Sequence, residues 1–473
     1  MYRTPGRFDH PLRLAIGNPN PYYFSYLIHA SQQLDRQLQT RLNGLASLDA
    51  DYWSFKGNAR RNHGHGLFQY PAMMVPQMVE AILDAVSLVH TEVEWVTDPF
   101  AGSGTILTES MRRGFSFAGR DINPLAILLC RTKAGPFFPE AMLAAVNELT
   151  GRIASDRSTK IDIDFPGIGK WFEPNVKIAL SRIRRSIMQE KSLASRRFFW
   201  VALAETVRIT SNSRTSTFKL HVRPEKEIRG REIDATATFK RVLSHNFENI
   251  ESLVNELRKN GFLDRGRFIG DVAIGLKDSR LPFPEVEGKC DVLITSPPYG
   301  DNVSTVPYGQ FSFLPLQWIN LADIDASAQA EYLRTTHEID FRSLGGSRRI
   351  KPDVPEALIS RSAALGRLLD RLSTEPADRA TKVTAFFRDL NESLPTIMKT
   401  LRPGGLMVWV LGNRRVSGKQ VPLDRILTEL LASFGSVPVA TLKRRIPSKR
   451  MALKNSVAKT MSAETILVMR KAT

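Results

Sequence analysis

A glycine-containing loop between a short apolar segment and a helical one most constrains the fold of this chain. The apolar segment Val93 to Val96 predicts a buried strand, and Ile106 to Arg113 predicts a helix. Between them lies the loop Asp98-Pro99-Phe100-Ala101-Gly102-Ser103-Gly104-Thr105. Gly102 and Gly104 let the backbone turn sharply and approach a ligand without an intervening side chain. This order of strand, loop and helix is the first half of a nucleotide-binding βαβ unit.

An acidic residue follows the second strand of this unit. Phe115 to Gly119 predicts that strand, and Asp121 comes after it. It lies roughly twenty residues beyond the glycine loop, where an acid receives ribose hydroxyls in dinucleotide sites. Capping of the next helix, which begins at Asn123-Pro124, is the alternative role for Asp121. Because the loop lacks both the Lys-Ser/Thr ending of a P-loop and the full G-x-G-x-x-G spacing, a nucleoside ligand without a pyrophosphate is favoured over NAD.

A second motif, Thr295-Ser296-Pro297-Pro298-Tyr299, directly follows the apolar run Cys290 to Ile294. The run predicts the end of a buried strand, and two successive prolines cannot continue a hydrogen-bonded ladder, so the chain leaves the sheet there. A hydroxyl, two rigid carbonyls and an aromatic ring are thus presented where open α/β sheets bind ligands. For this motif alone, a proline-stiffened turn with a packed tyrosine is the alternative.

The order of predicted elements indicates an α/β fold with a doubly wound sheet. A further strand is predicted at Arg267 to Ile274, with Asp271 at a strand end. The turn Arg402 to Gly405 precedes three closing strands at 406–411, 437–442 and 465–469. The predicted regions are an N-terminal helical or loop region (1–66), a main domain (67–134, 262–320 and 385–473), a mostly helical insertion (135–261) and an irregular second insertion (321–384).

Two polar segments of the insertions are candidates for contacts to phosphates. Thr210 to Lys219 (TSNSRTSTFK) combines hydroxyls, an amide and cations, and Phe341 to Arg349 is flexible and basic. A solvated loop is an equally open role for Thr210 to Lys219. The basic loop Asn58 to Gly66 contains His63 and His65, which could ligate a metal, but without a third ligand nearby a phosphate or solvent contact is favoured.

The net charge and the cysteine content limit the classes of partner and compartment that we expect. Lys and Arg number 66 and Asp and Glu 48, a formal charge of +18. Such an excess favours a polyanionic partner, because basic side chains displace counterions from phosphates. Cys130 and Cys290 are the only two cysteines, so we expect a reducing compartment and neither a disulfide scaffold nor a zinc site. Met1 to Ile16 lacks the apolar core of a signal peptide, and no apolar run reaches membrane-spanning length, so a cytoplasmic protein is expected.

Taken together, the motifs resemble those of the S-adenosylmethionine-dependent DNA amino-methyltransferases. The resemblance implies a Rossmann-like methyltransferase sheet with a C-terminal antiparallel hairpin. It covers Phe68 to Ala134, Arg267 to Leu316 and Ala385 to Arg470, and it leaves the N-terminal region and both insertions unassigned. The matching residues are Tyr70-Pro71 with the following helix, the loop Asp98 to Thr105, Asp121-Ile122-Asn123-Pro124, Gly270-Asp271, Thr295 to Tyr299 and Pro403-Gly404-Gly405.

The resemblance implies S-adenosylmethionine as the cofactor and duplex DNA as the partner. Asp98 and the glycine loop would face the methionine moiety, Asp121 the ribose, and Asp271 the adenine edge, with a strand-end turn as the alternative for Asp271. The expected cofactor-binding residues are Tyr70, Asp98, Phe100, Gly102, Ser103, Gly104, Thr105, Asp121, Ile122 and Asp271, and no metal is expected. A cognate restriction endonuclease is a candidate partner, and the oligomeric state is left open.

The catalytic residues that the resemblance implies are Ser296, Pro297, Pro298 and Tyr299. An exocyclic amine is a poor nucleophile because its lone pair is delocalised into the ring, so it needs acceptors for its hydrogens. Ser296 and the Pro297 carbonyl can each accept one hydrogen bond, and Tyr299 can stack on a base flipped out of the duplex. Methyl transfer is then a direct in-line displacement that depends on positioning.

The identity of the residue before the prolines bears on the target base. Family members with Ser at this position and Tyr at the end of the motif most often methylate N4 of cytosine, whereas Asp or Asn is usual for N6 of adenine. Ring-carbon methylation is not expected, because its thiolate nucleophile follows a proline and neither cysteine here does. The alternatives are an adenine-N6 DNA methyltransferase, an RNA base-amine methyltransferase and a non-catalytic nucleic-acid-binding protein of the same fold.

Overall fold

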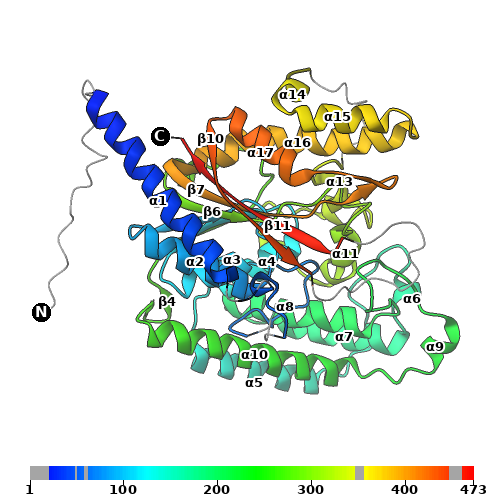
Figure 1. Cartoon of the computed structure of the whole chain (residues 1–473). Coiled ribbons are helices and arrows are strands. Elements are labelled where there is room, and N and C mark those ends of the chain that lie inside the picture. The colour runs from blue at the N-terminus through cyan, green and yellow to red at the C-terminus, as the bar shows by residue number, and fades with distance from the viewer. Residues whose placement is uncertain are drawn as a thin grey trace, which may run out of the picture.

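The computed structural model describes residues 21–47, 49, 51–57, 62–346, 356–446 and 461–472, with side chains from residue 31 onward (Figure 1). The expectations about Met1 to Ile16, about Asn58 to Arg61 and about Ser347 to Arg349 lie outside these described residues.

A seven-stranded sheet forms the centre of the molecule. Its strand order is β10-β11-β7-β6-β1-β2-β5, and neighbouring strands are parallel except that β11 is antiparallel to both β10 and β7. This topology confirms the doubly wound sheet with its C-terminal antiparallel hairpin. The strands are β1 (Trp95–Asp98), β2 (Ser116–Asp121), β5 (Val272–Leu276), β6 (Cys290–Thr295), β7 (Leu401–Leu411), β10 (Ser436–Arg445) and β11 (Ala463–Lys471).

The strand order reverses between β1 and β6, and this reversal positions the site. Chain segments that leave the carboxyl ends of these two parallel strands diverge to opposite sides of the sheet, which opens a crevice between them. The paired residues Thr97 and Leu293 lie near these ends. Both the glycine loop and the Ser-Pro-Pro-Tyr motif follow directly, so they meet at one edge of the sheet.

The Arg402 to Gly405 segment differs from its expected turn. It belongs to the first part of β7, and the pairing of β6 with β7 shifts register between Cys290 and Val292. Gly404 has a φ of 74°, which a residue with a side chain rarely adopts, and this local kink accommodates Pro403 within the strand.

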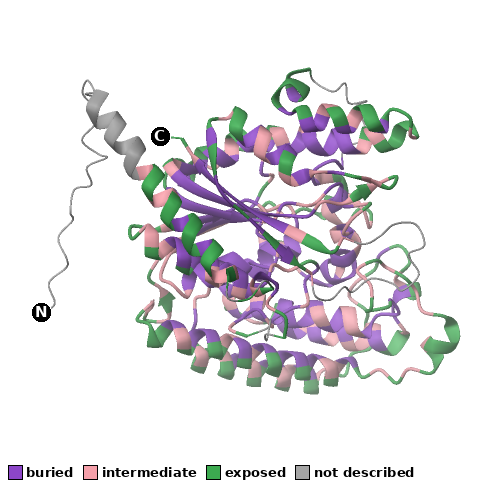
Figure 2. Ribbon diagram, viewed as in Figure 1, coloured by how far each residue is buried: buried purple, intermediate pink, exposed green. Residues whose placement is uncertain are grey.

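Helices cover both faces of the sheet because side chains alternate along each strand. On one face, Val292 and Ile294 of β6 pack in a core with α1 to α3, and on the other face Leu293 packs with α15 to α17. Figure 2 shows the strands largely buried between these layers of helices, whose exposed residues lie on the outside. The bounds are α1 (Pro21–Ser47), α2 (Pro76–Val89), α3 (Thr105–Met111), α15 (Ala363–Leu372), α16 (Ala377–Thr400) and α17 (Leu423–Ser433), with the short 3-10 helix η2 (Tyr52–Ser54) after α1.

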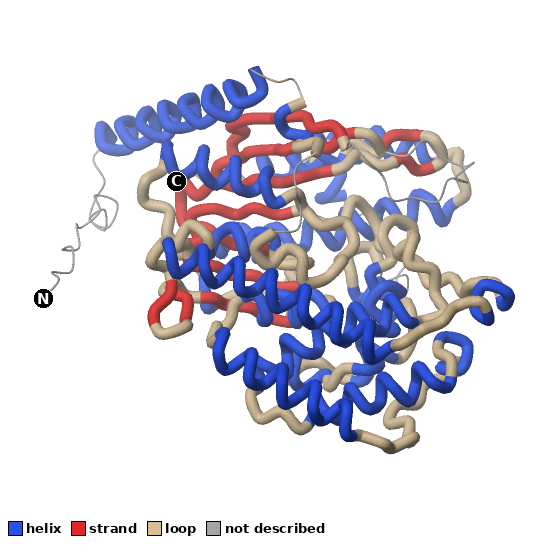
Figure 3. Tube along the Cα trace, turned by 90° about the horizontal axis from the view of Figure 1, so that it is seen from below, coloured by secondary structure: helices blue, strands red, loops and turns tan. Residues whose placement is uncertain are grey.

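The 135–261 insertion is helical, as predicted, and its helices share a hydrophobic core with α4 (Pro124–Lys133) and α11 (Tyr308–Trp318). Its central helix α8 contacts both of them. Figure 3 shows the helices gathered toward the β5 end of the row of strands. They are α5 (Pro139–Ser155), α6 (Ile168–Trp171), α7 (Pro174–Met188), α8 (Leu193–Thr210), α9 (Glu225–Arg229) and α10 (Ala235–Lys259), followed by the hairpin β3 (Leu263–Asp264) and β4 (Arg267–Phe268), and by η3 (Pro284–Val286) after β5.

The second insertion is largely helical in its described part, so the prediction of an irregular segment is wrong. Ser362 caps α15 by accepting a hydrogen bond from Leu365 N, and α16 already begins at Ala377. The other elements are α12 (Leu321–Ile324), η4 (Ala330–Leu333), α13 (Glu338–Arg342) and α14 (Glu356–Arg361), and a small hairpin of β8 (Arg415–Val416) and β9 (Lys419–Gln420) follows β7. Across the described ranges, no helix combines the length and apolar character needed to cross a membrane.

Candidate active site

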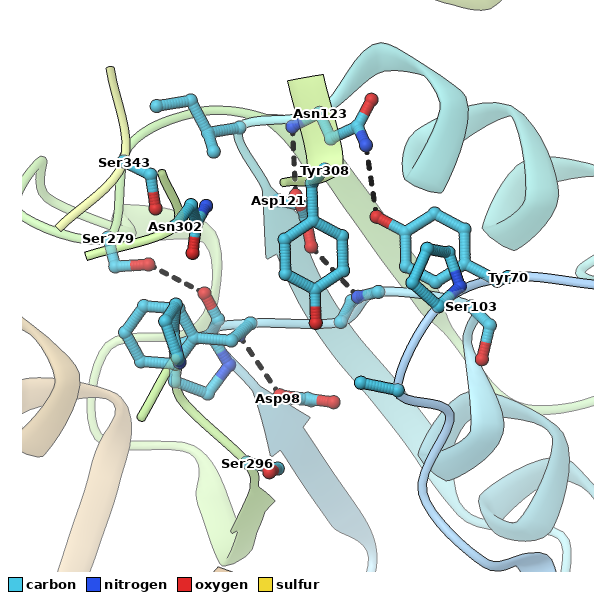
Figure 4. A pocket seen from close by; sticks show the side chains of 18 of the residues that line it. Tyr70, Asp98, Ser103, Asp121, Asn123, Ser279, Ser296, Asn302, Tyr308 and Ser343 are labelled. Atoms are coloured by element: carbon cyan, nitrogen blue, oxygen red, sulfur yellow. Dashed lines mark hydrogen bonds between the residues drawn. The ribbon is translucent and has the colours of Figure 1, made fainter. Parts of the chain in front are cut away.

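A cleft of about 900 Å³ lies at the carboxyl ends of β1, β2, β5 and β6 (Figure 4). The predicted site residues that line it are Tyr70, Asp98, Phe100, Gly102, Ser103, Thr105, Asp121, Ile122, Ser296 and Pro298. Gly104, Pro297 and Tyr299 are their chain neighbours. The fold therefore brings the two sequence motifs to one cavity.

Asp98 ends β1 and is buried at the base of the cleft. One carboxylate oxygen accepts hydrogen bonds from Thr295 Oγ1 at 2.7 Å and from Phe100 N at 3.0 Å. Thr295 is the last residue of β6, so this contact joins the glycine loop directly to the Ser-Pro-Pro-Tyr motif. Burial raises the pKa of Asp98 to about 7, although the two hydrogen bonds oppose the shift.

Asp121 organises the glycine loop from the end of β2. Its two carboxylate oxygens accept hydrogen bonds from Gly102 N and Asn123 N, both at 2.8 Å. Burial raises its pKa to about 6, against the effect of these backbone donors. The capping alternative belongs to its neighbour instead, because Asn123 Oδ1 accepts the hydrogen bond from Leu125 N at the start of α4.

The glycine loop owes its shape to two positive φ angles, 49° at Gly102 and 71° at Gly104. A Cβ at Gly104 would lie 3.0 Å from Cys130 Sγ, which is tighter than an ordinary contact. Behind the loop, the buried Lys133 donates a hydrogen bond to the Ser103 carbonyl at 2.8 Å, and burial lowers the pKa of Lys133 to about 8. Lys133 has no local sequence signal for this role, because a lysine on a helix is ordinarily exposed.

An aromatic wall closes one side of the cleft. Tyr70 and Tyr308 stack with their ring centroids 5.7 Å apart, and Asn123 Nδ2 donates hydrogen bonds to Tyr70 Oη at 3.0 Å and to Ser312 Oγ at 2.8 Å. In Figure 4, the Tyr308 ring extends from the level of Asp121 with its hydroxyl end toward Asp98. Tyr308 and Asn302 were not predicted as site residues, although both line the cleft and closely follow the Ser-Pro-Pro-Tyr motif in the chain.

Hydrogen bonds link the Ser-Pro-Pro-Tyr motif to strands β7 and β11. Ser296 Oγ lies 3.2 Å from Tyr299 Oη and 3.2 Å from the Val410 carbonyl of β7. The Tyr299 hydroxyl donates a 2.8 Å hydrogen bond to Glu464 Oε1 of β11. Pro298 lines the cleft and Pro297 is buried. The Tyr299 ring packs against Gly412, where a Cβ would lie 2.4 Å from Tyr299 Cδ2.

The structure does not bring Asp271 to this site. Asp271 is exposed and precedes β5, at the amino end of the strand, whereas the cleft lies at the carboxyl ends. Asp278 and Ser279, which follow β5, line the cleft instead, and Ser279 Oγ donates a 2.6 Å hydrogen bond to the Pro99 carbonyl. The expected strand ran from Arg267 to Ile274, but the hairpin of β3 and β4 uses Arg267 and Phe268, so the strand that enters the sheet starts later.

The second insertion contributes to the cleft as well. Ile339 and Arg342 of α13, with Ser343 and Leu344 after it, line the cleft, and Figure 4 shows Ser343 across it from Ser103. The Arg342 guanidinium lies over the Tyr332 ring at 4.2 Å and pairs with Glu338 at 2.9 Å. Of the basic stretch that begins at Phe341, Arg342, Ser343 and Leu344 line the cleft, whereas Phe341 itself is exposed.

Both cysteines are buried, and burial raises the pKa of each thiol, to about 12 for Cys290. Cys130 packs against Gly104 behind the loop, and Cys290 begins β6 at the amino end of that strand. A protonated, buried thiol is a poor nucleophile. Neither cysteine is placed for covalent attack on a substrate in the cleft.

Comparisons with known proteins give one match over nearly the whole chain. No protein-family model matches. The type II methyltransferase M.MvaI of Kocuria varians is 30% identical over 466 residues, which cover 94% of this chain and 98% of that protein. The type II methyltransferase M.MjaII of Methanocaldococcus jannaschii is 37% identical over 75 residues, 16% of this chain and 13% of that protein. The first similarity extends across the sheet and both insertions.

Proposed function

The chain belongs to the type II DNA methyltransferases, and we propose that it transfers a methyl group from S-adenosylmethionine to the exocyclic N4 amine of a flipped cytosine in duplex DNA. The observation that carries this proposal is the position of Ser296. Ser296 lines the cleft proposed to bind S-adenosylmethionine and also contacts Tyr299, which is proposed to contact the target base. Its hydroxyl therefore lies between the expected positions of the methyl donor and the base. A restriction endonuclease with the same recognition sequence is proposed as a partner of the system.

The electrostatics of the cleft support a cationic methyl donor. Asp98 and Asp121 are buried carboxylates whose hydrogen bonds come from a hydroxyl and backbone amides, and in the described residues neither forms an ion pair with Lys or Arg. Their raised pKa values mean that the ionised forms lack compensation, which a cation would supply. S-adenosylmethionine, when bound, supplies an electrophilic methyl group on a positively charged sulfur.

The residues of the cleft fit the parts of this donor by their chemistry. Asp98 and the amides of the glycine loop suit the charged methionine end. Each Asp121 oxygen keeps acceptor capacity beyond its backbone contact, which suits ribose hydroxyls. Ser279 and Ile122 offer a polar and an apolar contact of the kind a purine uses. Asp278, which follows β5 and lines the cleft, is the proposed contact to the adenine edge in place of Asp271.

Ser296 and the Pro297 carbonyl are the proposed acceptors for the two hydrogens of the target amine. Hydrogen bonds to both hydrogens draw them away from the ring plane and localise the nitrogen lone pair toward the methyl group. Tyr299 would then contact the extruded base through its ring face. Because the chemistry is a single displacement, the enzyme contributes mainly by orienting the amine and the donor.

The target base can be identified from the product. We expect DNA incubated with the protein and S-adenosylmethionine to contain N4-methylcytosine, measured by mass spectrometry of its nucleosides, with position mapping by sequencing. N6-methyladenine would overturn cytosine as the target base, but methylation of an exocyclic amine would still be the reaction. Methylation confined to RNA in parallel reactions would overturn duplex DNA as the substrate. Donor-binding protein that modifies neither polymer would favour the non-catalytic alternative.

We propose that the 135–261 insertion contacts the DNA through the loop 211–222. The base of this loop is tied down, since Asn212 N donates to the Trp171 carbonyl and Arg214 N to the His221 carbonyl. Phe218 packs on Phe311 of α11 with centroids 6.0 Å apart, and α11 begins at Tyr308 in the cleft. The exposed tip at 214–216 and Lys219 therefore lie on a stretch anchored beside the active site.

Neutralising this loop tip should weaken DNA binding without affecting the donor. We expect Arg214→Ala with Lys219→Ala to raise KM for DNA about 10-fold and to reduce the slope of log affinity against log salt by about 1 to 2. Arg258→Ala with Lys259→Ala is the matched control, because these exposed cations end α10, just before the β3–β4 hairpin that precedes the amino end of β5. Equal effects of the two double variants would contradict a specific role for the loop.

A further inference from the structure

A chain of hydrogen bonds runs from the catalytic motif to the last strand of the sheet. Ser296 Oγ lies 3.2 Å from Tyr299 Oη, which lies 2.8 Å from Glu464 Oε1. Glu464 Oε2 in turn accepts a 2.6 Å hydrogen bond from Arg444 Nη1. Glu464 is distant from the motif in sequence and belongs to none of the motifs that predict the site. Its contact with Tyr299 arises because β11 inserts beside β7.

Two contacts hold the Arg444 side chain, which ends this series of hydrogen bonds. The Arg444 side chain is buried on β10, opposite Glu464 in the β10–β11 ladder. Besides pairing with Glu464, its Nε donates a 3.1 Å hydrogen bond to the Trp53 carbonyl. A guanidinium offers only donors, so Arg444 cannot accept a proton from its partner. Glu464 is therefore held as an ion-paired carboxylate that faces Tyr299.

The protons available in this hydrogen-bond network allow Ser296 to act toward its protein partners as a donor alone. The ion-paired carboxylate of Glu464 offers only acceptors, so the single proton of the Tyr299 hydroxyl goes to Glu464. Burial and the Glu464 charge raise the pKa of Tyr299, which keeps that proton on the phenol. Ser296 can then donate to Tyr299 Oη or to the Val410 carbonyl, and neither of these can donate back. Among the residues that the structure describes, no donor therefore occupies the lone pairs of Ser296 Oγ.

We propose that Glu464 is a positioning residue that sets the direction of this hydrogen-bond chain and so keeps Ser296 Oγ available as an acceptor for the substrate amine. The inference rests on the proposed role of Ser296 as that acceptor. Without the carboxylate, the Tyr299 hydroxyl could turn toward Ser296 and occupy the lone pair that the amine requires. The same contact holds the Tyr299 ring against Gly412, where the ring can face the base.

Glu464→Gln tests the direction of the chain with little change of shape. Arg444 would bind the amide oxygen, which leaves the amide NH₂ facing Tyr299 and turns the tyrosine proton toward Ser296. We expect kcat for DNA methylation to fall about 10-fold or more, the size of one lost polar contact to the reacting group, with the affinity for S-adenosylmethionine unchanged by calorimetry. Glu464→Asp, which keeps the charge, should lose less than Glu464→Gln.

A double-mutant cycle separates this role from a structural one. In a Tyr299→Phe background there is no hydroxyl to turn, so adding Glu464→Gln should change kcat less than about 2-fold. If Glu464 mattered only through its ion pair with Arg444, the penalty would be the same in both backgrounds, and the proposal would be overturned. The surface pair of Glu375 with Lys419 at 2.7 Å gives the control, since Glu375→Gln should leave kcat unchanged.

The experiment also distinguishes this inference from the proposed function. Ser296→Ala measured in the same series reports on the acceptor itself. Full activity of Ser296→Ala would remove the proposed catalytic role and the inference with it. Loss of activity in Ser296→Ala together with wild-type kcat in Glu464→Gln would overturn the inference alone. A larger loss in Glu464→Asp than in Glu464→Gln would also overturn it, because side-chain length rather than charge would then control the rate.

Discussion

Ser296→Ala is expected to lower the rate of methyl transfer about 100-fold or more, which is typical of removing one preorganised hydrogen-bond partner of a reacting group. Alanine keeps the backbone of the motif and removes a hydroxyl that lies in the cleft and contacts Tyr299. The target amine would then have one acceptor fewer, and its lone pair would stay delocalised. The rate is measured in single turnovers with labelled S-adenosylmethionine and a DNA duplex.

The affinity for S-adenosylmethionine should not change in Ser296→Ala, so a lower rate would report on the transfer step. Ser296 is one residue among many that line the cleft, and the buried acids and the glycine loop are unchanged, so donor affinity by calorimetry should match the wild type within about 2-fold. Ser155→Ala, which removes an exposed hydroxyl at the end of α5, is the control. An unchanged single-turnover rate in Ser296→Ala would show that the amine finds its acceptors elsewhere.

Local sequence predicted the parts of this site that follow strands in the chain. The strand before Asp98, the strand before Asp121 and the run before Thr295 were each marked by apolar residues and then by glycine or proline. Such signals are local, because the residues that end a strand also present the ligand contacts. The structure accordingly gathers these segments at one edge of the sheet.

Some residues of the site have no local sequence signal, because only tertiary contacts bring them there. Glu464 contacts Tyr299 only because β11 lies next to β7, and Lys133 contacts Ser103 only because α4 packs behind the glycine loop. Asp271 was misplaced for a different reason. The apolar and charged residues around β5 do not reveal where the β3–β4 hairpin ends and the sheet begins, and a shift of a few residues moves an acid to the opposite edge of the sheet.

Asp121→Ala should weaken S-adenosylmethionine binding about 100-fold and also destabilise the fold. The substitution removes the acceptor of Gly102 N, which fixes the glycine loop, and the acceptor of Asn123 N, which leads into α4. Leaving two buried donors unpaired costs about 1 to 3 kcal/mol each, so the free energy of unfolding should fall measurably in denaturant titrations. Asp121→Asn should not restore binding, because its amide NH₂ would face one of two backbone donors.

The comparison with Asp271→Ala and the pH profile separate a ligand role from a purely structural one. Asp271 is exposed at the far end of β5, so its removal should change neither donor affinity nor stability. In the wild type, burial raises the pKa of Asp121 to about 6, so donor affinity should fall as the pH is lowered through that value and the carboxylate takes up a proton. Asp121→Ala should lose this part of the pH dependence. Reduced stability of Asp121→Ala with unchanged donor affinity would instead show that Asp121 only supports the glycine loop. The Asp121 carboxylate would then make no contribution to donor binding.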